Sequence, residues 1–197
     1  MRSHGKPKCG SPRRLRTSSI STENASLDHT NSGLAQWPAN RSYLAFIEAV
    51  EALAMGSVTY EWILRHADEV AAQTGTTWPY SQPTWVFSRR TLPRVAGADI
   101  RFVRGYVRPI HAAMRDTAGS KNIWIVGGGD LAGQFYDAGL LDEMVVHVGS
   151  VTLGRDKQLF PRRVTSPPLR LVSVRQVGSG LAELRYEVPT VAGTAAA

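Results

Sequence analysis

The sequence feature that most constrains the fold is an apolar run that ends in consecutive glycines. Residues 122–126, with the sequence Asn-Ile-Trp-Ile-Val, are expected to form a buried strand, and residues 127–129 are all glycine. A strand that is apolar on both faces is typical of the middle of a parallel sheet with helices on both sides. Leu131 and Phe135 follow at helical spacing. The order of strand, glycine turn and helix predicts an α/β protein.

Helical and strand patterns alternate along the rest of the chain. Apolar residues at helical spacing predict helices over residues 41–51, 59–73 and 107–118. Short apolar runs predict further strands over residues 52–55, 84–87, 99–103 and 144–148. Residues 169–177 and 181–188 flank Gly178-Ser179-Gly180, which predicts a closing β-hairpin. This order predicts a largely parallel sheet with antiparallel strands at one side.

The positive charge of the chain is concentrated at its N-terminus. The 197 residues carry a formal net charge of +7, and residues 1–22 contain six basic and no acidic residues. The other residues therefore carry a net charge of +1 (+7 less +6). We expect residues 1–24 to be a disordered basic tail, residues 25–189 to be the folded domain, and residues 190–197 to be a flexible tail. A solvated tail is favoured over a nucleic-acid contact, because the body of the chain is nearly neutral.

Composition argues against several other classes of protein. No segment approaches the roughly 20 apolar residues that a membrane-spanning helix needs, and the N-terminus lacks the apolar core of a secretory signal. Cys9 is the only cysteine, so neither a disulfide framework nor a cysteine zinc site is expected. The five histidines show no metal-ligand spacing. We therefore expect a cytoplasmic protein without a bound metal.

The glycine turn after Val126 has the properties of an anion-binding turn. Glycines let the backbone approach a phosphate, and the free N–H groups at a helix start stabilise its charge. The spacing of Gly127, Gly128, Gly129 and Gly133 is neither the Rossmann fingerprint nor a P-loop. From this motif alone, a dinucleotide-binding turn and a merely tight turn both remain open.

Two further junctions after strands can belong to the same cleft. Gly56 and Thr59 offer a close backbone approach and a hydroxyl where a strand meets a helix. Ser88, Arg89 and Arg90 end another strand, where a hydroxyl and a guanidinium can hold the extra phosphate of NADPH. The alternatives are a helix N-cap for Thr59 and a solvated loop for the two arginines. Because the carboxyl ends of parallel strands meet at one edge, a shared cleft is favoured.

Several of these segments resemble the dihydrofolate-reductase-like superfamily. The similar segments are Ala54–Glu61, Val86–Arg89 and Ile123–Leu131. Residues 139–143, followed by Leu153-Gly154 and Leu159-Phe160-Pro161, are similar more specifically to the C-terminal reductase domain of the riboflavin-biosynthesis protein RibD. The resemblance covers about residues 25–188. It implies a three-layer αβα fold with a mixed, mostly parallel central sheet, which agrees with the predicted C-terminal hairpin.

The resemblance also implies a cofactor and its site. It implies NADPH as the hydride donor and a small heterocycle as the substrate. Members of that family often form homodimers, which implies a homodimer here. The implied cofactor-binding residues are Gly56, Thr59, Ser88, Arg89, Val126, Gly127, Gly128, Gly129 and Leu131. Asp28 is the implied catalytic residue that orients or protonates the substrate, and its alternative role is to form a turn. Trp37 is either a stacking surface for a flat heterocycle or a core residue.

The sequence departs from the family pattern near both halves of this site. Ser57 stands where the family commonly has Arg, which removes one cation expected near the 2′-phosphate of NADPH. His29 replaces a glycine after Asp28, and residues 16–24, expected to form the preceding strand, are polar and basic. Such a segment is a poor central strand. The first strand is therefore either degraded or replaced.

These observations predict an NADPH-dependent oxidoreductase that resembles 5-amino-6-(5-phosphoribosylamino)uracil reductase. Two alternatives stay open, namely a pterin reductase similar to dihydrofolate reductase and a non-catalytic nucleotide-binding protein whose substrate site has decayed. Asp142 and Glu143 look like an acid–base pair, but local capping and salt bridges are favoured for them. The expected partners are the heterocyclic substrate and a second copy of the chain, with no membrane or nucleic acid.

Overall fold

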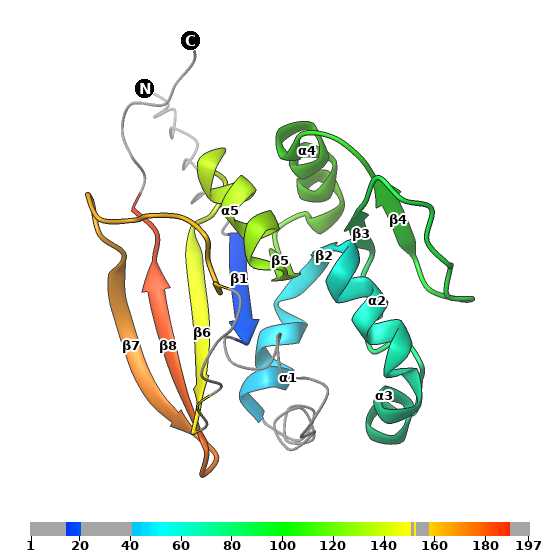
Figure 1. The fold of residues 1–197 in the computed structure, drawn as a ribbon, viewed down its shortest axis with the longest axis horizontal. Coiled ribbons are helices and arrows are strands. Elements are labelled where there is room, and N and C mark those ends of the chain that lie inside the picture. Colours follow the sequence, from blue (N-terminus) through cyan, green and yellow to red (C-terminus); the bar gives the residue numbers. More distant parts are fainter. Residues whose placement is uncertain (1–14, 21–40, 151, 153–157, 190–197) are drawn as a thin grey trace, which may run out of the picture.

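The computed structural model describes residues 15–20, 41–150, 152 and 158–189, in which a single mixed sheet carries helices on both faces (Figure 1). The strands are β1 (Leu15–Ile20), β2 (Val50–Gly56), β3 (Thr84–Phe87), β4 (Ile100–Val103), β5 (Asn122–Gly127), β6 (Glu143–Gly149), β7 (Arg170–Val177) and β8 (Leu181–Glu187). The helices are α1 (Arg41–Glu48), α2 (Ser57–Arg65), α3 (Ala67–Thr74), α4 (Val107–Ala118) and α5 (Gly129–Asp137). The strand order in the sheet is β4-β3-β2-β5-β1-β6-β8-β7.

Strands β1 to β6 pair in parallel, and the last two strands form an antiparallel hairpin. The parallel pairs are β1 with β5 and β6, β2 with β3 and β5, and β3 with β4. β8 pairs antiparallel with both β6 and β7. The hairpin turn contains Gly178 at a φ of 62°, a left-handed conformation that favours glycine. The predicted parallel sheet with a closing hairpin is confirmed, and Figure 1 shows the hairpin at one end of the sheet and β4 at the other.

Side chains of the central strands alternate between two helix layers. One face of β2 and β5 packs against α4 and α5, through Ala52, Ala54, Ile123, Ile125, Met114 and Phe135. The other face packs against α1 and α2, through Leu53, Trp124, Phe46, Met55, Tyr60 and Ile63. Because successive strand residues point to opposite faces, both faces need apolar side chains. The three-layer αβα architecture is therefore confirmed (Figure 1).

The boundary between α1 and β2 corrects the first predicted helix. α1 ends at Glu48, three residues before the predicted end, and Val50 begins β2. Val50 pairs with Asn122 and is only 1% exposed, in a cluster with Leu53 and Trp124. Pairing and burial in the sheet thus override the helical spacing that linked Val50 to α1.

The single helix predicted over residues 59–73 is also wrong, because two helices meet at His66. The helical conformation begins earlier, at Ser57, and is interrupted at His66, where φ is −107° and ψ is 25°. The ring nitrogen Nδ1 of His66 lies 2.8 Å from the carbonyl oxygen of Trp62, which also accepts the His66 backbone N–H. A side chain that competes for a helical acceptor in this way favours a break.

Residues 15–20 are the largest departure from the predicted domain boundaries. They were assigned to the disordered tail, but they form β1 between β5 and β6. Leu15 lies opposite Ile123, and Ile20 lies opposite His147. Without β1, the facing backbone groups of β5 and β6 would lack sheet partners, and backbone pairing does not depend on side-chain polarity. A polar sequence can therefore occupy this central position.

Candidate functional site

The carboxyl ends of β2 and β5 form a topological switch point. The two strands are parallel neighbours, with Met55 opposite Gly127. The chain leaves β2 through α2 toward β3 on one side, and leaves β5 through α5 toward β6 on the other side. In open α/β sheets, ligands bind in the crevice where successive connections diverge in this way. The architecture therefore locates the candidate site between the residues that follow β2 and β5.

Two glycines leave open space beside the backbone at this edge of the sheet. A Cβ added to Gly56 would meet only the backbone nitrogen of Gly128, at 3.9 Å, and a Cβ added to Gly128 would meet nothing within 4 Å. Gly56 has a φ of −79°, which any residue can adopt, so its own backbone does not require glycine. The peptide bond between Gly127 and Gly128 is cis. Side chains at Gly56 and Gly128 would occupy open space beside the backbone amides.

Three helices begin at the same edge of the sheet. Their N-cap residues are Gly56 for α2, Tyr106 for α4 and Gly128 for α5, and none makes a side-chain capping hydrogen bond. The first amides of each helix keep donor capacity and carry the positive end of the helix dipole. α4 has its predicted bounds, but its N-terminus was not predicted to be part of the site. Its signal was Gly105, which follows a strand and has a φ of 100°, so strand, glycine and helix again follow one another.

Ser88 and Arg89 follow β3, whose last residue, Phe87, lies opposite Gly56. The Ser88 hydroxyl accepts the backbone N–H of Arg90 at 2.9 Å and donates to its carbonyl oxygen at 3.1 Å, so it folds the turn. Arg89 is exposed and has no hydrogen bond or ion pair among the described residues. Arg90 instead makes a two-pronged ion pair with Glu61 at 2.7 and 2.8 Å. The Arg90 side chain is 57% exposed despite this pair, so the solvated-loop interpretation stays open for both arginines.

Gly129 and Leu131 have packing roles in addition to any contact with a ligand. A Cβ on Gly129 would overlap the carbonyl oxygen of Leu159, so the segment around Leu159 requires glycine at this position. The Leu131 side chain is 6% exposed and lies in the core under α5. In the first turn of α5, the Ala132 N–H donates a hydrogen bond to the Gly128 carbonyl oxygen. Gly129 and Leu131 can therefore offer a phosphate only their backbone amides.

The structure places two of the other predicted site residues, Thr59 and Val126, and does not describe the remaining ones. Thr59 is the third residue of α2, and Gly56 is the N-cap, so the N-cap alternative for Thr59 is wrong. Val126 is half-buried and packs against the clusters around Met55 and Leu53. Asp28, His29 and Trp37 lie outside the described residues, so the substrate side of the site stays a prediction.

Asp142 and Glu143 lie at the opposite edge of the sheet. Glu143 begins β6 and is 4% exposed, with its Oε1 atom 3.8 Å from Nε of Arg185. The carbonyl of Asp142 accepts the N–H of Val188 at 2.9 Å. These contacts indicate a structural role for both residues. β5, β1 and β6 are parallel, so the start of β6 lies at the edge opposite the glycine turns that follow β2 and β5.

His147 is a buried residue of β6. Its Nε2 atom lies 3.2 Å from Oε2 of Glu183. Burial opposes ionisation of Glu183, but hydrogen bonds from His147 and Arg175 lower its pKa to about 2. Within the described ranges, no group of three or more His, Cys, Asp or Glu residues could hold a metal ion. The helices of those ranges are too short or too polar to cross a membrane.

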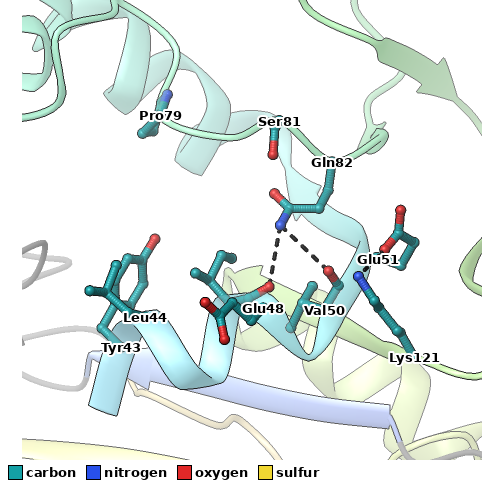
Figure 2. A pocket seen from close by; sticks show the side chains of 10 residues that line it. Tyr43, Leu44, Glu48, Val50, Glu51, Pro79, Ser81, Gln82 and Lys121 are labelled. Atoms are coloured by element: carbon teal, nitrogen blue, oxygen red, sulfur yellow. Dashed lines mark hydrogen bonds and ion pairs between the residues drawn. The ribbon is translucent and has the colours of Figure 1, made fainter. Parts of the chain in front are cut away.

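A separate hollow of about 490 Å³ lies at the amino ends of the strands (Figure 2). The Gln82 side-chain amide donates to the carbonyl oxygens of Ile47 and Val50 there, at 3.3 and 3.4 Å. Lys121 is paired with Glu51 at 2.7 Å. Glu51 and Glu48 both line the hollow, and the one lysine there is already paired, so a phosphate is disfavoured. We therefore assign the candidate cofactor site to the carboxyl ends of the strands.

Comparisons with known proteins agree with this architecture. A family model, the RibD C-terminal domain, matches residues 66–182. The uncharacterised protein YwjB of Bacillus subtilis is 26% identical over 147 residues, which cover 75% of this chain and 79% of YwjB.

Solved structures show the same fold at low identity. A putative riboflavin biosynthesis protein from Shewanella sp. PV-4 has a TM-score of 0.62 and 22% identity, and the match covers 88% of this chain and 95% of that one. A pyrimidine reductase-like protein from Corynebacterium diphtheriae has a TM-score of 0.56 and 15% identity, with 90% and 92% covered. The predicted dihydrofolate-reductase-like fold is thereby confirmed.

Proposed function

Because the chain belongs to the RibD C-terminal domain family, a family of the riboflavin-biosynthesis reductase type, we propose that it is an NADPH-dependent reductase. The substrate we propose is 5-amino-6-(5-phosphoribosylamino)uracil or a related ribosylamino-pyrimidine. One relative of the same fold is named for riboflavin biosynthesis and another for pyrimidine reduction, which supports this class of substrate.

The observation that carries the proposal is the open space beside the backbone of Gly56 and Gly128, where two helices begin. Amides at the start of α2 and α5 would donate to the pyrophosphate of NADPH, and both helix dipoles would favour its charge. Arg89, exposed at the end of β3, would hold the 2′-phosphate. NADPH, when bound, supplies the hydride, and the chain contributes the orientation of the nicotinamide. Asp28 is the residue we propose to orient or protonate the substrate.

The experiment that tests the proposal measures cofactor binding and turnover together. Quenching of tryptophan fluorescence would follow NADPH binding, and the loss of NADPH absorbance would follow reduction of each heterocycle. We expect saturable NADPH binding and turnover of the ribosylamino-pyrimidine in preference to dihydrofolate. Preference for dihydrofolate would favour the pterin reductase instead. Binding without any turnover would favour the non-catalytic protein, and no binding at millimolar NADPH would refute every version.

We also propose that the chain forms a homodimer through β7, the edge strand of the hairpin. Leu171, Val172 and Val174 on β7 are 51%, 48% and 59% exposed. An eight-residue edge strand with exposed apolar side chains has unpaired backbone groups and is a template for another strand. A second copy offers the same strand about a two-fold axis, and pairing would cover both edges.

A further inference from the structure

The position of Ser57 is the starting point, because an arginine is expected there and the chain has a hydroxyl. The guanidinium of Arg90 reaches this position from the adjacent strand end. Its Nη2 atom lies 3.2 Å from the Ser57 hydroxyl oxygen. A cation is therefore present beside the first turn of α2, although it comes from the residue after Arg89 rather than from residue 57 itself.

Glu61 holds that cation in place. Ser57 and Glu61 are four residues apart on α2 and so share one face of the helix. Both carboxylate oxygens of Glu61 accept hydrogen bonds from Arg90, at 2.8 Å from Nη1 and 2.7 Å from Nη2. The carboxylate thus occupies the two-pronged arrangement of donors that a phosphate would otherwise take.

We propose that Arg90 binds the 2′-phosphate of the cofactor together with Arg89, and that Glu61 is an internal anion that competes with this phosphate for Arg90. The inference rests on the proposed function, since it concerns the same crevice. The crevice begins at Gly56, the residue before Ser57, and Gly56 lies opposite the end of β3. A dinucleotide whose pyrophosphate lies at Gly56 therefore has its adenosine ribose within reach of this end of α2 and β3.

Arg90 can leave Glu61 for a phosphate at little cost in free energy, because the Arg90–Glu61 pair is exposed to solvent. The side chains of Arg90 and Glu61 are 57% and 33% exposed. An ion pair at such exposure contributes little to stability, so Arg90 can leave Glu61 without disturbing the fold. A 2′-phosphate carries more negative charge than one carboxylate, so Arg90 pairs with the phosphate in the NADPH complex.

NADH would meet the same residues differently. Its ribose carries a 2′-hydroxyl, which can donate a hydrogen bond to the Glu61 carboxylate while Arg90 stays paired. Glu61 therefore reduces the preference for NADPH in two ways, by occupying Arg90 and by accepting the hydroxyl of NADH. Removing its charge should strengthen NADPH binding and leave NADH binding equal or weaker.

The test compares the dissociation constants of NADPH and NADH for four variants and the unmodified chain, measured by calorimetric titration. The variants are Glu61→Gln, Arg90→Gln, the double variant, and Glu51→Gln. Glu51→Gln is the matched control, because Glu51 is an exposed carboxylate in an ion pair of 2.7 Å with Lys121 at the opposite edge of the sheet. It changes the net charge of the protein by the same amount as Glu61→Gln.

We expect Glu61→Gln to tighten NADPH binding by about 2- to 5-fold, the value of an exposed ion pair, with no gain for NADH. Arg90→Gln should weaken NADPH by at least about 10-fold, because charge-assisted hydrogen bonds are lost, and in its background Glu61→Gln should add nothing beyond the Glu51→Gln control. Equal effects of Glu61→Gln and Glu51→Gln on NADPH would overturn the competition while leaving the proposed function standing. An unmodified chain that binds neither cofactor would overturn both.

Discussion

Gly56→Val is the substitution that tests the cofactor crevice most sharply. The backbone of Gly56 is extended, with a φ of −79° and a ψ of 162°, and valine accepts this conformation readily. The added Cβ would lie 3.9 Å from the backbone nitrogen of Gly128 and would meet no other atom of the protein within 4 Å. The Cβ therefore has room beside Gly128, and the unfolding temperature of the variant reports whether the two methyl groups of valine have room as well.

The size of the effect follows from the contacts that valine would block. If a phosphate accepts two amide hydrogen bonds between Gly56 and Gly128, their loss costs about 3 kcal/mol at about 1.5 kcal/mol each. That cost corresponds to an affinity for NADPH about 100-fold lower. A valine N-cap is poorer than glycine by up to about 1 kcal/mol, which would lower the unfolding temperature by about 2–4 °C.

The assay is calorimetric titration of NADPH into Gly56→Val and into Gly180→Val, with unfolding temperatures measured in parallel. Gly180 is the matched control, because a Cβ there also meets nothing within 4 Å but the residue lies in the hairpin turn. Gly180→Val should bind NADPH as the unmodified chain does. A folded Gly56→Val variant with a dissociation constant within about threefold of the control would refute phosphate binding at this crevice, since about threefold corresponds to less than one hydrogen bond.

Three further predictions concern packing, pH and assembly. Gly129→Ala should lower the unfolding free energy by about 1–3 kcal/mol in a denaturant titration, because its Cβ overlaps the carbonyl of Leu159; an unchanged midpoint would contradict that packing. Burial, with Arg115 and Arg108 nearby, lowers the pKa of His111 from 6.5 to about 4, so its contribution to stability is present above 6.5 and is lost as the pH falls toward 4. His111→Gln should flatten the pH dependence of unfolding in that window, and parallel curves for the two proteins would refute this. Val174→Asp should convert a homodimer into a monomer in light scattering, whereas an unmodified chain that is already monomeric would exclude the β7 interface.

The parts of the fold that were predicted from sequence are those with strong periodicity. β3 and α4 have the predicted bounds, and β5 differs by one residue, because each of these elements combines local propensity with burial on one or both faces. Only the family resemblance placed a strand near β1. Its polar residues carry no strand signal of their own, and it depends on backbone pairing with two strands far away in sequence. The break at His66 was missed because it depends on one side-chain contact with Trp62.

The main-chain positions of the candidate site were predicted from sequence, but the pairing between its side chains was not. The strand ends at Gly56, Ser88 and Gly128 could be grouped because parallel strands bring their carboxyl ends to one edge. The contact between Arg90 and Glu61 joins residues 29 positions apart, and no spacing rule relates a loop after one strand to the face of a neighbouring helix. The packing role of Gly129 was likewise invisible, because it depends on Leu159.

Hydrogen–deuterium exchange with and without NADPH tests most directly whether the cofactor binds at the carboxyl ends of β2 and β5. The predicted result is slower exchange at the amides of residues 56–60 and 127–132, where α2 and α5 begin. The peptides that line the opposite hollow, residues 43–51 and 79–82, should exchange equally in both conditions. Slower exchange confined to that hollow, or no change at the two helix starts under saturating NADPH, would contradict the proposed site.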